Sequence, residues 1–260
     1  MYNEEQIIQS INQRITINND PYPYFFMDKF LPLEIAKKAE QEFNNSPNLD
    51  DAGSARYQKT KLSFNKYEEM PPTIKSIIKI FYSNSFLKVL ENKFNLKNLE
   101  PDWSLHGGGM HQSFNGGFLK IHSDFIYKRK SKQRRALNLL LYLNSNWKKE
   151  WNGSIELWDK KMNNLKFSVE PLINNALVFR TDKDSNHGFP DPIACPSNES
   201  RTSIALYYYT KEKSIFPFSL KKRQYFHAVW KTRPNKVEPT FSDQTSLFKR
   251  LKNKFYYRLF

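Results

Sequence analysis

Cysteine is nearly absent from this sequence, which has a single Cys195 in 260 residues. One thiol cannot build an internal disulfide framework, and it cannot supply a zinc site made mainly of cysteine. Disulfide-stabilised domains are therefore excluded, and we expect a reducing, cytoplasmic location. The acidic and polar first ten residues, MYNEEQIIQS, also argue against a secretory signal.

Long apolar runs, internal repeats and low-complexity segments are missing as well. No stretch approaches the length of about 20 apolar residues that a transmembrane helix needs. Three glycines stand together at Gly107–Gly109, but no Lys-Ser or Lys-Thr pair follows them, so we expect a turn rather than a phosphate-binding loop. A chain of this length can bury a sizeable core, and one domain with elaborations is the natural expectation.

Acidic residues are scarce near the C-terminus. Residues 211–260 contain 13 Lys and Arg against 3 Asp and Glu, so they carry +10 of the net charge of +15. Such a basic extension can contact an acidic partner, nucleic acid or an anionic membrane surface, although general solubility explains the charge equally well. Within it, Phe248, Leu251, Phe255 and Leu259 follow helical spacing, which predicts an amphipathic basic helix that docks on the domain, a partner or a membrane.

The first hundred residues have mainly helical patterns. Apolar side chains at helical spacing predict helices over 32–45 and 72–82, and Ser85 is a candidate cap for a third. A strand is expected at YFFMDKF, residues 24–30.

The character of the sequence changes after Pro101, where short β-type runs alternate with turn-rich segments. These runs are GFLKIH, ALNLLLYLN, SIELWD, LKFSVEP, NALVFR and SIALYYYT. The pattern predicts an α+β fold in which a jelly roll over about 101–210 is supported by helices from about 1–100. Residues 1–210 then form a single domain, and 211–260 form a basic C-terminal extension.

Three candidate metal ligands stand out. In GGFLKIHSDF, His122 and Asp124 are two residues apart, so an extended chain would place them on the same face. Taken alone, this pair is equally consistent with a structural hydrogen bond. However, His187 follows the strand NALVFR, and two imidazoles with one carboxylate are the ligand set of non-haem Fe(II) oxygenases. Such a set leaves coordination positions open for a bidentate cosubstrate and for dioxygen.

A candidate carboxylate clamp follows the third ligand. Arg201 begins the strand RTSIALYYY, and Ser203 faces the same side two positions later. A guanidinium group and a hydroxyl group together can hold a carboxylate, and Tyr142 in LLLYLN could add a phenol from a neighbouring strand. The alternative for Arg201 is an ordinary surface residue that opens a strand.

In this order, the segments resemble the prolyl-4-hydroxylase-like branch of the Fe(II)/2-oxoglutarate-dependent dioxygenases over roughly residues 20–210. The resemblance is carried by DPYPYFFMDKFLPLEIAKKAEQEF, GGGMHQSFNGGFLKIHSDF, RRALNLLLYLNSNW, NGSIELWD, NALVFR, NHGFPDPI and RTSIALYYYT. It implies a double-stranded β-helix (a jelly roll) with iron held by His122, Asp124 and His187. It further implies that Arg201 and Tyr142 bind 2-oxoglutarate.

Two features depart from this family pattern. Many prolyl hydroxylases have a tyrosine where this chain has Phe118, four residues before the first metal histidine. The loop between His187 and Arg201 is also longer than in compact members of the family.

The resemblance implies hydroxylation of an unactivated C–H bond with Fe(II), 2-oxoglutarate and dioxygen, and ascorbate is a further candidate cofactor. A prolyl-type hydroxylase that acts on a peptide is the leading interpretation. A hydroxylase of a free amino acid, a sugar or another small metabolite is the alternative, and a non-catalytic jelly-roll binding protein is a second alternative.

Several other polar residues have more than one interpretation. The basic run KRKSKQRR, residues 128–135, closely follows His122 and Asp124 and should lie near the mouth of the site. It would attract an anionic substrate there, or serve only as a solvated connector. His106 and His111 flank GGGM, where we expect a structural or loop role, with support of the metal ligands or contact with the substrate as the alternative. His227 is expected at the surface.

Overall fold

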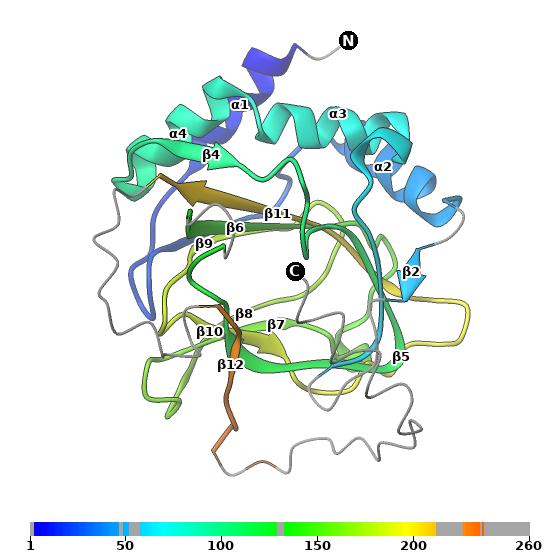
Figure 1. Ribbon diagram of the computed structural model, residues 1–260. Coiled ribbons are helices and arrows are strands. Elements are labelled where there is room, and N and C mark those ends of the chain that lie inside the picture. Colours follow the sequence, from blue (N-terminus) through cyan, green and yellow to red (C-terminus); the bar gives the residue numbers. More distant parts are fainter. Residues whose placement is uncertain are drawn as a thin grey trace.

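The computed structural model describes residues 3–46, 49–51, 58–128, 133–211, 226–234 and 236. In this part of the chain, four α-helices lie along one side of a strongly curved sheet (Figure 1). The helices are α1 (Glu4–Arg14), α2 (Leu33–Asn44), α3 (Pro72–Phe81) and α4 (Asn84–Phe94), with short 3₁₀-helices η1 (Tyr67–Glu69) and η2 (Lys149–Trp151). The strands are β1 (Tyr24–Met27), β2 (Asp50–Asp51), β3 (Gln58–Phe64), β4 (Leu99–Pro101), β5 (Gly109–Ser123), β6 (Arg134–Tyr142), β7 (Ile155–Trp158), β8 (Leu165–Val169), β9 (Ala176–Arg180), β10 (Asn186–Phe189), β11 (Arg201–Thr210) and β12 (Val229–Trp230).

The helix boundaries follow local capping chemistry. Helix α3 begins with Pro72 in its first turn, where the missing N–H costs nothing. The side chain of Ser83 caps α4 by accepting a hydrogen bond from the backbone N–H of Phe86, so the prediction of Ser85 as the cap is wrong. Helix α1, which the sequence analysis missed, begins with a capping box at Asn3.

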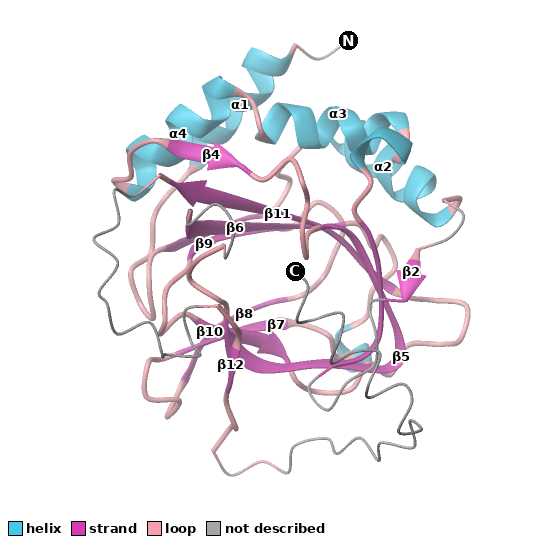
Figure 2. Cartoon of the chain, viewed as in Figure 1, coloured by secondary structure: helices cyan, strands magenta, loops and turns pink. Residues whose placement is uncertain are grey.

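The strands form two facing layers that β5 joins. Figure 2 shows one layer, with β11, β6 and β9, directly beneath the helices, and a second layer, with β10, β7 and β8, on the far side. The long strand β5 pairs with β11 near its start and with β10 near its end, so it passes from one layer to the other. Every strand pairing is antiparallel within the described ranges. The predicted α+β jelly roll with supporting helices is confirmed.

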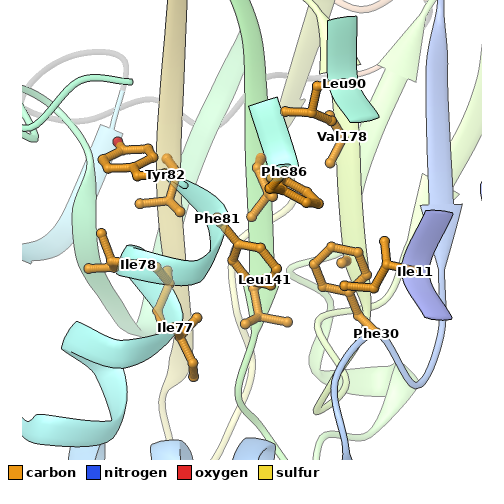
Figure 3. Packing of buried hydrophobic residues seen from close by; sticks show 14 of the residues in the cluster. Ile11, Phe30, Ile77, Ile78, Phe81, Tyr82, Phe86, Leu90, Leu141 and Val178 are labelled. Atoms are coloured by element: carbon orange, nitrogen blue, oxygen red, sulfur yellow. The ribbon is translucent and has the colours of Figure 1, made fainter. Parts of the chain in front are cut away.

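The upper layer is buried on both of its faces. On β6, Leu139 and Leu141 point toward the helices, whereas Leu140 and Tyr142 point into the space between the layers. Figure 3 shows Leu141 close to Phe81 from helix α3, within the main hydrophobic core. Because both faces need apolar cover, the run LNLLLYLN is almost continuously hydrophobic rather than alternating. Side chains on the other face of these strands point into the space between the layers, where the polar residues described below lie.

Part of the basic extension packs against the domain. Residues 226–234 include β12, which pairs with the end of β5. The amphipathic helix predicted from Phe248 to Leu259 lies outside the described residues. None of the described helices has the length and apolar character needed to span a membrane.

Candidate metal centre

His122 and His187 lie opposite each other on neighbouring antiparallel strands. They are a register pair of β5 and β10, and their ring centroids are 4.5 Å apart. Directly paired residues point to the same face of a sheet, so both imidazoles enter the space between the two layers. His187, which was expected after the strand NALVFR and outside any predicted strand, belongs to β10, which pairs with β7 on its other side.

Asp124 completes the group from the residue just beyond β5. Its carboxylate oxygens lie 3.7 Å from Nε2 of His122 and 3.6 Å from Nε2 of His187. One ligand atom from each residue lies within 4.8 Å of the others, a spacing at which all three can contact one metal ion. The structure therefore brings together the three predicted ligands.

Backbone carbonyl groups orient both rings. Nδ1 of His122 is 2.9 Å from the carbonyl oxygen of Lys120, and Nδ1 of His187 is 2.9 Å from that of Ser185. A carbonyl oxygen only accepts hydrogen bonds, so Nδ1 carries the proton in each ring. Each Nε2 then presents a lone pair to the shared space, as a metal ligand requires.

The protonation states also suit metal binding. Burial, together with the neighbouring His122, lowers the pKa of His187 to about 4, so this imidazole is neutral near pH 7. Burial pushes the pKa of Asp124 upward, but Arg135 and the two histidines outweigh it and hold this pKa well below its usual range. His187 and Asp124 can thus contact a metal ion near pH 7 without losing a proton first.

Two residues that the sequence analysis missed hold the Asp124 carboxylate. Nη2 of Arg135 lies 3.3 Å from Oδ2 of Asp124, and the Asn138 amide donates a 2.8 Å hydrogen bond to the same oxygen. Arg135 also donates a 2.8 Å hydrogen bond to the side-chain oxygen of Asn138, so each of these three residues contacts the other two. The available signal was Asn138 itself, a polar residue inside the apolar run of β6.

Arg201 lies buried in the same space between the layers. It begins β11, and its Nε donates a 2.6 Å hydrogen bond to the carbonyl oxygen of Gly153. Its Nη2 is 3.2 Å from the hydroxyl oxygen of Tyr142, and its guanidinium carbon lies 4.2 Å from the centre of the Phe189 ring. Among the residues that the structure describes, no carboxylate forms an ion pair with Arg201, although its side chain is almost fully buried.

A buried cation without an anionic partner is costly, so the surroundings of Arg201 fit an incoming carboxylate. Strand register adds further polar groups at this place: Ser203 pairs with Tyr142 on β6 and with His111 on β5. All three are buried, and within the described ranges Nε2 of His111 has no hydrogen-bond partner. His111 is therefore a strand residue on the same face as Ser203, which makes a loop role wrong but leaves a structural role and a role at the site open.

Lys61 brings a second cation to this region from β3. It pairs in register with Ser113, which in turn pairs with Arg201, so the three side chains form one row across the sheet. Burial lowers the pKa of Lys61 to about 8, with Asp124 opposing this shift and Arg201 adding to it. Sequence reasoning missed Lys61 because the side-chain alternation of β3 gives no marker for a functional residue.

The remaining polar candidates have mixed outcomes. At the ends of the basic run 128–135, Lys128 forms a 2.6 Å ion pair with Asp102, while Arg135 is buried against Asp124. A solvated connector is therefore the wrong interpretation for Arg135, and residues 129–132 lie outside the described part. His106 lies exposed in a turn, and His227 is exposed as predicted.

Residues 108–209, which contain all these pocket strands from β5 to β11, match the family described as the 2OG-Fe(II) oxygenase superfamily. The matched part, which is less than half of the chain, is therefore similar to this superfamily. That superfamily uses Fe(II) as its metal and 2-oxoglutarate as its cosubstrate, and the residues of the site fit both groups. The two imidazoles and the carboxylate suit Fe(II), and Arg201, which has no ion-pair partner in the described part of the chain, suits a carboxylate. Among curated proteins, no relative matches the chain.

Solved structures with the same fold include several oxygenases. A prolyl-4-hydroxylase from Pseudomonas putida aligns with a TM-score of 0.54 and 14% identity, covering 79% of this chain and 100% of that one. A prolyl hydroxylase from Trichoplax adhaerens, in complex with a hypoxia-inducible-factor peptide fragment, gives 0.54 and 16%, covering 79% and 90%. HygX from Streptomyces hygroscopicus, with nickel, 2-oxoglutarate and hygromycin B bound, gives 0.51 and 10%, covering 72% and 83%. At these identities the likeness concerns the fold.

Proposed function

We propose that this 2-oxoglutarate-dependent dioxygenase hydroxylates an unactivated C–H bond, with His122, Asp124 and His187 as the ligands of Fe(II). The observation that carries the assignment is the buried Arg201, which forms no ion pair with any carboxylate among the described residues and lies between the same two layers as the three ligands. Arg201 then holds the distal carboxylate of 2-oxoglutarate, assisted by Tyr142 and Ser203. A non-catalytic binding protein would not need an unpaired buried cation and a complete ligand set side by side.

The protein's own residues prepare the site in three ways. Arg135 and Asn138 keep Asp124 ionised and fix its orientation. The carbonyl groups that accept from Nδ1 of each histidine direct both Nε2 lone pairs to the same point. Arg201, hydrogen-bonded to Gly153 and Tyr142, presents a fixed guanidinium group to the cosubstrate. When bound, Fe(II) and 2-oxoglutarate supply the activation of dioxygen that C–H hydroxylation requires.

For the substrate, we propose a peptide with a reactive proline. Two prolyl hydroxylases with the same fold support this class, and one of them is seen with a peptide fragment. A small metabolite is the second candidate, because HygX shares the fold and is seen with hygromycin B. Lys61 supports a substrate with an anionic group in either case, since its ammonium group has no ion-pair partner among the described residues.

Two further proposals concern the cell and the extension. The single cysteine, Cys195, is buried and unpaired, which supports a reducing, cytoplasmic compartment. The basic residues of 211–260 support contact with an acidic partner or an anionic surface. Ascorbate belongs in the assay as a candidate reductant.

The deciding experiment has two stages. First, 2-oxoglutarate is added without oxygen to protein loaded with Fe(II); bidentate chelation should produce a weak visible charge-transfer band, and His122→Ala should abolish it. Second, succinate formation is screened against prolyl peptides and metabolites, each in acidic and neutral forms. A band that is the same in His122→Ala as in the wild type would reject the metal assignment. Preference for neutral substrates, unchanged in Lys61→Met, would reject the anionic substrate.

A further inference from the structure

Strand β12 adds a segment from outside the matched family region to the edge of the metal site. The family match ends at residue 209, whereas β12 comprises Val229 and Trp230. Figure 1 shows β12, in orange, beside the end of β5. In register, Trp230 pairs with His122 and Val229 with Ser123, and the N–H of Lys231 donates a 2.7 Å hydrogen bond to the carbonyl oxygen of Ile121.

This register places Trp230 next to a metal ligand. Because paired residues share a face, His187, His122 and Trp230 form one row across β10, β5 and β12. The indole lies 4.8 Å from the His122 ring, with 37° between their planes. The His122 imidazole is therefore held between two rings, and a carbonyl oxygen fixes its Nδ1.

Arg233 fastens this segment to the strands on the other side of the site. It is buried, and its Nη2 lies 2.8 Å from Oδ1 of Asp191, just beyond β10. Its Nη1 lies 3.6 Å from Oε1 of Glu156 on β7, the strand that flanks His187. The neighbouring Lys236 also approaches Asp191, at 3.5 Å, but its side chain is about half exposed. The Arg233 side chain is 1% exposed and Asp191 is 40% exposed, so this contact is more buried than the one from Lys236 and holds the segment more firmly.

We propose that residues 226–234 are a built part of the active site, in which Arg233 anchors the segment across β7 and β10 so that Trp230 holds the His122 imidazole in its ligand orientation. Trp230 is a positioning residue, because it acts on the metal through His122. The inference rests on the proposed metal site. Residues that support a metal-binding histidine commonly change metal affinity 10–100-fold when they are substituted.

The test uses metal-free, full-length protein titrated with Co(II), an ion that quenches nearby tryptophan fluorescence. Trp230→Phe should bind Co(II) about as well as the wild type, but with less quenching, because the indole beside His122 is gone while a ring remains in its place. Trp103→Phe is the matched control: Trp103 is 48% exposed and contacts Tyr67 and Tyr82 instead, so the quenching should persist. Undiminished quenching in Trp230→Phe would overturn the placement of Trp230 beside His122. Both variants keep an aromatic ring, so the comparison does not depend on a variant that fails to fold.

The positioning role is tested by affinity. Trp230→Ala should weaken Co(II) binding roughly 10-fold or more, and Arg233→Met should do the same and also reduce the quenching. Lys236→Met is the control for Arg233, because it removes a cation from the same carboxylate without breaking a buried contact. Wild-type Co(II) affinity in folded Trp230→Ala or in folded Arg233→Met would overturn the proposal. Neither readout requires turnover, so a lack of 2-oxoglutarate consumption would reject the proposed activity while leaving this inference to be judged separately.

Discussion

The guanidinium group of Arg135 lies 3.3 Å from the carboxylate of Asp124, on an oxygen that also accepts from Asn138. This contact neutralises a buried carboxylate before any metal binds. It also explains why an arginine at the end of a basic run is almost fully buried. The guanidinium group lies 3.6 Å from the centre of the Tyr207 ring, which supports it from the other side.

Removing Arg135 should make metal binding sensitive to acid. Without the arginine, burial would dominate and raise the pKa of Asp124, so protons would compete with the metal at a higher pH. For Arg135→Met we expect Co(II) affinity to fall at least about 10-fold between pH 8 and pH 6, beyond any fall in the wild type. Titration at both pH values measures this. Arg134→Met is the neighbouring control, and an equal pH dependence in Arg135→Met and the wild type would contradict the role.

Metal-free protein should lose stability in acid because of His187. The pKa of this residue is about 4 in the folded protein and about 6.5 in the unfolded chain, so the unfolded chain binds the proton first. Its contribution is complete above pH 6.5 and is lost as the pH falls toward 4. We expect roughly 2–3 kcal/mol of unfolding free energy to be lost between pH 7 and pH 4.5 from this group.

Denaturant unfolding with a chelator present, at several pH values, measures that loss. The control is His187→Gln, which cannot take up the proton and should show a shallower dependence. Burial, with help from Lys61 and Arg201, also lowers the pKa of His111, so some acid sensitivity should remain in the variant. Equal slopes for His187→Gln and the wild type would show that His187 is not the residue responsible.

Much of this site could be predicted because its residues follow the two-residue alternation of side chains along a strand. His122 and Asp124, and likewise Arg201 and Ser203, are two residues apart at one end of a strand, so a strand prediction fixes their common direction. Arg135 and Asn138 could not be found in this way. They are three positions apart, and an irregularity in the β6–β11 ladder next to Tyr208 accompanies their convergence on one carboxylate.

Short or context-dependent features also escaped prediction. Strand β12 has only two residues, too few for any alternation, and its partner β5 lies about a hundred residues earlier in the sequence. Ser83 and Ser85 are both reasonable caps for α4 by sequence, and only the position of the first turn decides between them. These elements depend on tertiary contacts that local patterns do not contain.

Gly153 should be required for the cosubstrate pocket. Its φ is +78°, and an added Cβ would lie 3.1 Å from Cδ of Arg201 and 3.2 Å from the Trp147 ring. Gly153→Ala should therefore displace Arg201, weaken 2-oxoglutarate binding and cost about 1–3 kcal/mol in backbone strain. Gly107→Ala is the control, because its φ is +73° but its Cβ would meet only Tyr207, at 3.8 Å. Calorimetric 2-oxoglutarate titration separates them, and equal affinity in both variants would contradict the prediction.

Variants of the carboxylate anchor should rank in a definite order. Arg201 is buried and hydrogen-bonded to Tyr142, so removing it leaves the distal carboxylate of 2-oxoglutarate unpaired in a dry pocket. Breaking one partner of a buried pair costs roughly 3–5 kcal/mol, which is on the order of a hundredfold or more in affinity. Arg201→Ala should raise the 2-oxoglutarate requirement by at least that factor while Co(II) still binds. Arg201→Lys should lose less, since the charge remains without the planar fork.

Tyr142→Phe and Ser203→Ala should lose still less than Arg201→Lys, roughly 0.5–3 kcal/mol each, the range for one hydrogen bond to a charged group. Tyr142 has a further reason for a modest effect, because its ring also packs in the apolar cluster between the sheets, and phenylalanine keeps that packing. The measurement is 2-oxoglutarate titration of succinate formation at saturating Fe(II), with Lys61→Met included as the other cation of the row. If Arg201→Ala keeps a normal 2-oxoglutarate requirement while Lys61→Met needs much more 2-oxoglutarate, then Lys61 on β3 anchors the distal carboxylate, and the role assigned to Arg201 on β11 is wrong.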